Sequence, residues 1–229
     1  MEHKEQHFSA NDMVRDIVIG MSDGLTVPFA LAAGLSGVLT NNNLILVAGI
    51  AEICAGSIAM GLGGYLAGQT EIDHYNAEEK REYEEVKTKF EFEKQEVRDV
   101  FNNYGLSIES QNTIADELAK DEKKWVDFMM RFELGLEKPN AGRATKSALN
   151  IGGAYIVGGV IPLLGYWFTN SPNNGLIVSS IITIICLFIF GFYKSKLTGQ
   201  NALKGALRVT FIGIVAASVA YFLAKLVGQ

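Results

Sequence analysis

Five stretches of this sequence are apolar and long enough to cross a lipid bilayer as helices, and no other feature restricts the fold as strongly. A bilayer core of about 30 Å requires roughly 20 apolar residues in an α-helix. The stretches are 17–39, 44–66, 147–168, 175–192 and 209–224. The first two contain one charged residue each, Asp23 and Glu52, and the next two contain none. The sequence therefore predicts an all-α membrane protein with five transmembrane helices.

The charged residues are concentrated in one segment, 71–137. It holds 19 of the 25 acidic and 10 of the 20 basic residues of the chain. Because a globular domain mixes polar and apolar residues along each element, this segregation indicates a charged insert outside the membrane. The expected divisions are 1–69 for an N-terminal tail and two transmembrane helices, 70–140 for the insert, and 141–229 for three more transmembrane helices. The formal net charge of −5 excludes a basic nucleic-acid-binding protein.

The basic residues also predict the orientation of the chain. All lysines and arginines except Lys225 fall on one side of the five-helix topology, and the short links 41–43 and 169–174 contain none. Loops rich in lysine and arginine stay in the cytoplasm. We therefore expect the N-terminus and the insert on the cytoplasmic side and the C-terminus on the opposite side.

The insert is expected to form a cytoplasmic domain of three helices. Residues 71–101 are rich in Glu, Lys and aromatics and contain no Gly or Pro, so the second transmembrane helix should continue into the insert as one long rod. Gly105 follows as a breaker, and Ser107 can cap a helix that runs to about Ala119. A third helix is expected over 121–136.

Two carboxylates lie where charge is costly. An ionised side chain at the centre of a membrane helix costs at least roughly 2.5–3.5 kcal/mol on insertion scales. Asp23 precedes Gly24 and Pro28, a combination that opens a helix and frees backbone carbonyls. Acids on neighbouring transmembrane helices indicate a path for cations or protons; the alternative is an interfacial cap at Asp23 and a neutral, hydrogen-bonded Glu52. Met60 follows Glu52 by a little over two turns and lies near the same helix face.

Four glutamates form a stripe on the expected rod. At 100° per residue, Glu82, Glu85, Glu93 and Glu96 occupy an arc of about 80° beside the apolar face. Carboxylates on one stripe repel one another unless a cation or protons neutralise them. The pattern is compatible with metal binding and equally with a solvated Glu/Lys helix.

The third expected helix offers softer ligands next to another acid. Met129 and Met130 lie one helical turn before Glu133. Oxygen ligands alone suit Mg²⁺, Ca²⁺ or Mn²⁺, whereas an added thioether shifts the preference towards Fe²⁺, Co²⁺ or Zn²⁺. A histidine-centred site is not expected, because the chain has only 3 histidines. Its single Glu-x-x-His, Glu71 to His74, falls short of the two that di-iron carboxylate sites use.

Two long motifs resemble the vacuolar iron transporters of yeast, plants and bacteria. They are DGLTVPFALAAGLSG from Asp23 and AEICAGSIAMGLGGYLA from Ala51, and the likeness continues through the insert and the three later spans. The resemblance implies a five-span homodimer whose ion path runs between the first and second helices of the two subunits and is lined by Asp23, Glu52 and Met60. It also implies a cytoplasmic metal site formed by Glu82, Glu85, Glu93, Glu96, Met129, Met130 and Glu133.

The resulting hypothesis is a transporter, not an enzyme, that exports Fe²⁺ from the cytoplasm in exchange for protons. Zn²⁺, Co²⁺ and Mn²⁺ are alternative ions, and the insert would collect metal for the path. Three other functions stay open: a membrane-anchored ferroxidase, an iron-buffering or iron-sensing protein, and a channel. The plain N-terminus carries no vacuolar targeting signal, so a vacuolar membrane and a prokaryotic plasma membrane are both compatible locations.

Overall fold

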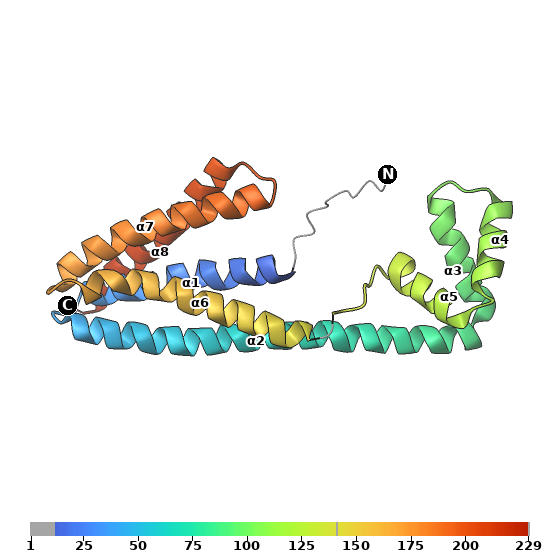
Figure 1. Ribbon diagram of the computed structural model, residues 1–229, viewed down its shortest axis with the longest axis horizontal. Coiled ribbons are helices and arrows are strands. Elements are labelled where there is room, and N and C mark those ends of the chain that lie inside the picture. The colour runs from blue at the N-terminus through green and yellow to red at the C-terminus, as the bar shows by residue number, and fades with distance from the viewer. Residues whose placement is uncertain (1–11, 141, 229) are drawn as a thin grey trace, which may run out of the picture. The chain divides into compact units, whose positions relative to one another are not determined.

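The computed structural model describes residues 12–140 and 142–228, and every regular element within them is helical (Figure 1). The elements are α1 (Asp12–Ser36), α2 (Asn42–Thr88), α3 (Phe90–Asn103), α4 (Ile108–Leu118), α5 (Glu122–Phe128), the π-helix η1 (Met129–Glu133), α6 (Arg143–Trp167), α7 (Pro172–Leu197) and α8 (Ala202–Val227). The chain divides into two compact units, with the divisions after Leu66 and after Arg143. We call residues 67–143 the insert unit and the remainder the membrane unit.

Five helices of the described chain are long and apolar enough to cross a membrane: α1, α2, α6, α7 and α8. This confirms the expected number of spans. The first span ends earlier than expected, because α1 stops at Ser36 and the chain then turns. The short fifth stretch belongs to α8, which has 26 residues. Large apolar side chains such as Ile58 and Phe211 are 71% and 67% exposed within the chain, as expected for groups that face lipid.

Glycines let α1 approach α6 until their backbones touch. A Cβ atom placed on Gly20 would overlap the carbonyl oxygen of Ile151, and one on Gly24 would overlap that of Tyr155. From the other side, a Cβ atom on Gly158 would lie 2.9 Å from the backbone nitrogen of Leu25. Small residues at such crossings are typical of helices that pack inside membranes. The contact fixes the part of α1 that carries Asp23 against α6.

Polar contacts join α1, α2 and α6 beyond this crossing. The Ser36 hydroxyl donates to the Tyr166 hydroxyl at 2.8 Å, and the Asn42 amide donates to the backbone oxygens of Tyr166 at 3.1 Å and Thr169 at 2.7 Å. Around them Ala32, Ile45, Ile53, Leu163 and Tyr166 form a buried cluster. These contacts satisfy polar groups that would be costly if left unpaired in a membrane.

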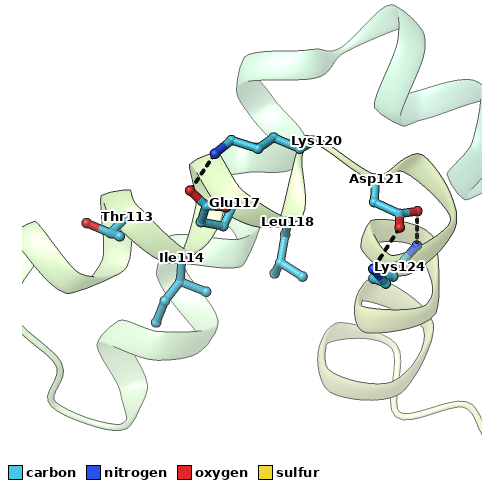
Figure 2. Close-up of a pocket in the computed structure, with 7 residues that line it drawn as sticks. All are labelled: Thr113, Ile114, Glu117, Leu118, Lys120, Asp121 and Lys124. Carbon is cyan, nitrogen blue, oxygen red and sulfur yellow. Dashed lines mark hydrogen bonds and ion pairs between the residues drawn. The ribbon is translucent and has the colours of Figure 1, made fainter.

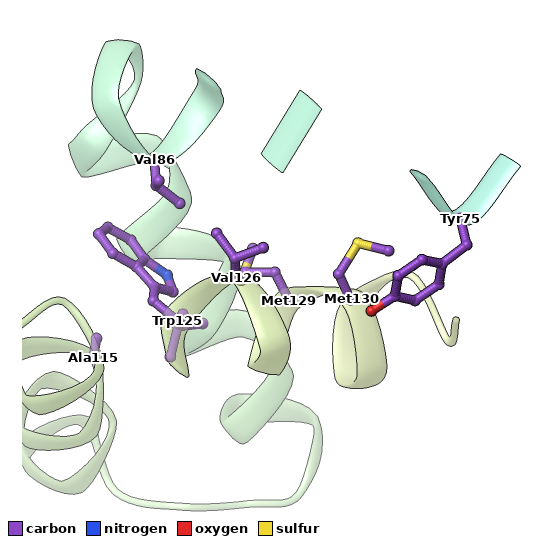
Figure 3. Close-up of a cluster of buried hydrophobic side chains, with 8 residues drawn as sticks. Tyr75, Val86, Ala115, Trp125, Val126, Met129 and Met130 are labelled. Atoms are coloured by element: carbon purple, nitrogen blue, oxygen red, sulfur yellow. The ribbon is translucent and has the colours of Figure 1, made fainter. Parts of the chain in front are cut away.

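The insert unit has its own hydrophobic core (Figure 3). Trp125 is 1% exposed and packs with buried residues from α2, α3, α4, α5 and η1. The buried members are Tyr75, Val86, Val97, Ala115, Trp125, Val126, Met129 and Met130. In Figure 3 the side chains of Trp125 and Val126 lie toward Val86 of α2, while Met130 lies beside Tyr75.

The expected continuous rod over 71–101 is wrong. Helix α2 ends at Thr88, Lys89 leaves the helical conformation (φ −126°, ψ 37°), and α3 begins at Phe90. On one straight helix Val86 and Val97 would be roughly 16 Å apart along the axis, too far to share a small core. The break lets both valines pack in one cluster with Trp125, and Phe90 contacts the Trp125 ring edge-on at 5.2 Å. Burial of these side chains outweighs the helical propensity of the Glu/Lys-rich sequence.

Of the other two helices expected in the insert, one is a regular α-helix and the other is interrupted by a π-helix. The Ser107 hydroxyl accepts from the Ser110 backbone N–H and caps α4, as predicted. The helix expected over 121–136 is instead the short α5, capped by Asp121, followed by the wider π-helix η1, in which the Leu134 N–H donates to the Met129 oxygen. A π-helix of this kind is rare and occurs most often at functional sites.

Candidate metal cluster and ion path

Three carboxylates converge where α2 breaks and α3 begins. Glu82 and Glu85 come from the last turns of α2 and Glu93 from the first turn of α3. One oxygen of each lies within 4.8 Å of the others, a spacing at which a single cation could contact all three. Glu82 and Glu93 are 1% exposed, and Glu85 is half-buried. The break at Lys89 therefore creates this cluster.

The charge of the cluster is only partly balanced by the protein. Arg81 lies 3.6 Å from Glu82 and 3.7 Å from Glu85, and Lys89 lies 2.7 Å from Glu85. Both oxygens of Glu93 are buried and lack a hydrogen-bond partner. Burial, reinforced by the charges of Glu96 and Glu82, raises the pKa of Glu93 to about 8. At neutral pH a cation that binds Glu93 must therefore displace a proton from its carboxylate.

Two further predicted ligands act on the cluster electrostatically. Partial burial and the carboxylates of Glu96 and Glu82 raise the pKa of Glu133, on η1, to about 7. Burial also raises the pKa of Glu96, on α3. The three-carboxylate grouping itself contains Glu82, Glu85 and Glu93 only.

The structure places the two predicted methionine ligands in the hydrophobic core. Met129 and Met130 are 0% and 1% exposed and belong to the cluster around Trp125 (Figure 3). They are the first two residues of η1, which ends at Glu133. Both methionines make the contacts of core residues. They nevertheless lie within one helical turn of Glu133, a predicted ligand.

The membrane unit contains the other predicted residues. Asp23 on α1, Glu52 on α2 and Met60 on α2 are all half-buried. A fourth residue, not predicted from the sequence, joins them: the hydroxyl of Tyr155 on α6 donates a hydrogen bond to Oε1 of Glu52. The backbone oxygen of Tyr155 lies against Gly24, the residue after Asp23. The available signal was a polar hydroxyl near the middle of an uncharged span.

A second missed carboxylate is Asp16. It lies one turn before Gly20 on α1 and is 1% exposed, with Arg15 at 4.0 Å. The apolar stretch from which the first span was predicted starts at residue 17, one position too late to include it.

The insert unit also contains an open pocket, formed by residues outside the three-carboxylate cluster (Figure 2). Its volume is about 450 Å³, and α4 and α5 form its walls. The lining residues are Thr113, Ile114, Glu117, Leu118, Lys120, Asp121 and Lys124. The charged members pair with each other, Lys120 with Glu117 and Lys124 with Asp121, as the dashed lines of Figure 2 show. None of them belongs to the three-carboxylate grouping.

Taken together, the apolar helices and the buried acids define a multi-pass membrane protein with a carboxylate-rich helical insert. The sequence pattern of the VIT family matches residues 14–225, nearly the whole chain. The chain therefore belongs to the VIT family.

Named relatives cover almost the full chain. A protein named vacuolar iron transporter 1 from Tulipa gesneriana is 49% identical over 226 residues, 99% of this chain and 92% of its own length. The protein of the same name from Arabidopsis thaliana is 50% identical over 225 residues, 98% of this chain and 90% of its own length. Protein CCC1 from Saccharomyces cerevisiae is 39% identical over 224 residues, 94% of this chain and 69% of its own length.

Proposed function

We propose that the protein is a divalent-metal transporter that exports Fe²⁺ from the cytoplasm across a membrane in exchange for protons. The observation that carries the proposal is the convergence of Glu82, Glu85 and Glu93 in a member of the VIT family. Relatives 49% and 50% identical to the chain are named vacuolar iron transporters. In this function the insert unit lies in the cytoplasm, the chain acts as a homodimer, and a vacuolar or plasma membrane can hold it.

The insert unit collects metal. A divalent cation at the three-carboxylate cluster would offset the repulsion that the protein leaves unbalanced at Glu93. Glu96 and Glu133 add negative charge from α3 and η1. Met129 and Met130 supply soft donors in this proposal, because a methionine side chain has three rotatable bonds and adapts readily. Such donors favour Fe²⁺, Co²⁺ or Zn²⁺ over Mg²⁺ and Ca²⁺.

The membrane unit carries the ion. Asp23, Glu52 and Met60 line the path, which runs between α1 and α2 of the two subunits. A carboxylate can hold either a proton or a share of a metal ion, and competition between the two couples their movements. Ionisable residues inside membrane helices mark such routes in pumps and transporters. Met60 disfavours hard cations.

The test is Fe²⁺ uptake into proteoliposomes that hold the full-length protein, with and without an imposed pH gradient, while internal pH is followed. Metal entry driven by the gradient and accompanied by proton movement supports exchange. Metal entry without proton movement indicates a channel. Absence of entry, with metal still bound, contradicts transport; iron-dependent oxygen consumption would then separate a ferroxidase from a buffering or sensing protein.

A further inference from the structure

Tyr155 contacts both helices that carry the acids of the proposed path. Its side chain is buried at 2% exposure on α6, and its hydroxyl donates to Oε1 of Glu52 on α2. Its backbone oxygen faces Gly24 of α1, the residue after Asp23. A phenol can donate one hydrogen bond, and the hydroxyl of Tyr155 donates it to the Glu52 carboxylate.

The sequence of α2 is shaped to admit this ring. Gly56 follows Glu52 by one turn, and a Cβ atom on it would overlap the Tyr155 hydroxyl and the ring carbons beside it. Any larger residue at position 56 would displace the ring from Glu52. Glycine at this position is therefore required by the Tyr155–Glu52 contact as well as by the general need for small residues between membrane helices.

The hydrogen bond leaves the two oxygens of Glu52 unequal. Oε1 is occupied by Tyr155, whereas Oε2 is buried and has no hydrogen-bond partner. A buried oxygen without a partner is costly, so Oε2 is the oxygen of Glu52 that gains most from a cation or a proton. The phenol takes one lone pair of Oε1 and part of its negative charge, so Oε2 is the stronger donor for a cation and chelation by both oxygens is disfavoured.

We propose that Tyr155 is a positioning residue that keeps Glu52 a one-oxygen ligand for the transported metal. The inference rests on the proposed function. A carboxylate that chelates with both oxygens binds a cation more tightly and releases it more slowly, which limits the rate of a transporter. Chelating carboxylates are also a common feature of Ca²⁺ sites, whose geometry is wide and flexible. The phenol thus promotes release of Fe²⁺ and disfavours Ca²⁺.

The test compares Tyr155→Phe with Tyr166→Phe in proteoliposomes. Both tyrosines are buried on α6 and each substitution removes one hydroxyl, but the hydroxyl of Tyr166 is hydrogen-bonded to Ser36 and that of Tyr155 to Glu52. For Tyr155→Phe we expect the KM for Fe²⁺ and the maximal rate to fall together, each by about fivefold to tenfold, which is the effect of one hydrogen bond of roughly ordinary strength. Ca²⁺ should then inhibit Fe²⁺ uptake at a concentration lower by a similar factor. Tyr166→Phe should leave all three quantities unchanged.

Several outcomes would overturn the inference. One is a folded Tyr155→Phe protein with wild-type KM and wild-type Ca²⁺ inhibition. Another is a fall in rate with a raised KM, or equal effects of both substitutions, because either result indicates a structural role only. If the wild-type protein carries no Fe²⁺, the proposed function fails and the inference fails with it. If the wild type and Tyr166→Phe transport normally and Tyr155→Phe does too, only the inference fails.

Discussion

Glu82 and Glu93 place carboxylate oxygens within 4.8 Å of each other although they belong to different helices, and both side chains are 1% exposed. Two ionised acids so close together and so buried repel strongly. The fold tolerates this arrangement at an electrostatic cost that a bound cation or proton can remove. The cost has measurable consequences for stability and for metal affinity.

The substitution Glu93→Gln should stabilise the metal-free protein at high pH. The pKa of Glu93 is about 8 in the fold, above the ordinary value of 4.5, so the folded state binds more protons than the unfolded state between these pH values. Stability is therefore lost as pH rises from about 4.5 to about 8. In full-length protein with a chelator, we expect a higher Tm for Glu93→Gln than for wild type at pH 8.5 and a much smaller gain at pH 5. A pH-independent difference would contradict this, and Glu109→Gln on the exposed face of α4 is the control.

Metal affinity of the cluster should fall as pH falls. A carboxylate must lose its proton to bind a cation. Because the pKa of Glu93 is about 8 and that of Glu133 about 7, protons compete increasingly below pH 8. We expect the Kd for Co²⁺ to weaken by about one to two orders of magnitude between pH 8 and pH 6. Calorimetry in buffers of different ionisation enthalpy should show proton release on binding; a constant Kd without release would count against the site.

Replacing Met129 or Met130 with Leu separates their packing role from their proposed ligand role. The exchange conserves volume and hydrophobicity, so it should cost less than about 1.5 kcal/mol even in the tightly packed core around Trp125. If the thioethers are ligands, affinity for Co²⁺ and Zn²⁺ should fall severalfold while affinity for Mn²⁺ changes little. If each of the three ions binds the variant as tightly as it binds wild type, the methionines have a packing role only.

Asp23→Ala should abolish metal transport without unfolding the protein. Asp23 is the only acid expected in the first span from the sequence, and the residue after it, Gly24, packs against the backbone of Tyr155, whose hydroxyl donates to Glu52. Proteoliposome uptake gives the activity, and size-exclusion chromatography in detergent checks the fold. Glu109→Gln, distant in sequence and exposed, is the charge control. Unchanged uptake by Asp23→Ala would remove Asp23 from the path.

Gly20→Ala should destabilise the membrane unit. The added methyl group would overlap the carbonyl oxygen of Ile151, which is backbone and cannot rotate away. Gly63→Ala on α2 is a matched control, because nothing lies within 4 Å of a Cβ atom there and alanine favours helix. We expect a Tm several degrees lower for Gly20→Ala and an unchanged or higher Tm for Gly63→Ala. Equal Tm values would mean that α1 and α6 separate more easily than their backbone contact indicates.

The five spans could be predicted from the sequence because hydropathy over about 20 residues depends on composition alone. The cap at Ser107 was predictable for a related reason, since capping is a local interaction. The break at Lys89 was not, because no Gly or Pro marks it and its cause is the packing of Val86 and Val97 around one tryptophan. The predicted stripe of four glutamates assumed a straight helix. The observed cluster contains Glu82, Glu85 and Glu93 but not Glu96, because the break at Lys89 changes the direction of the chain between them. The Tyr155–Glu52 bond joins residues 103 positions apart, a separation beyond any periodicity argument.

Long separations of this kind also govern how the protein is made. Ser36 on α1 pairs with Tyr166 on α6, which is synthesised 130 residues later. At ribosomal speeds of about 5–20 residues per second, α1 waits for roughly 6–26 s before its partner exists. During that interval the backbone of α6, against which Gly20 and Gly24 pack in the finished fold, has not yet been synthesised. The first two spans and the whole insert are therefore synthesised before α1 can form its backbone contact with α6, so this contact closes late in biosynthesis.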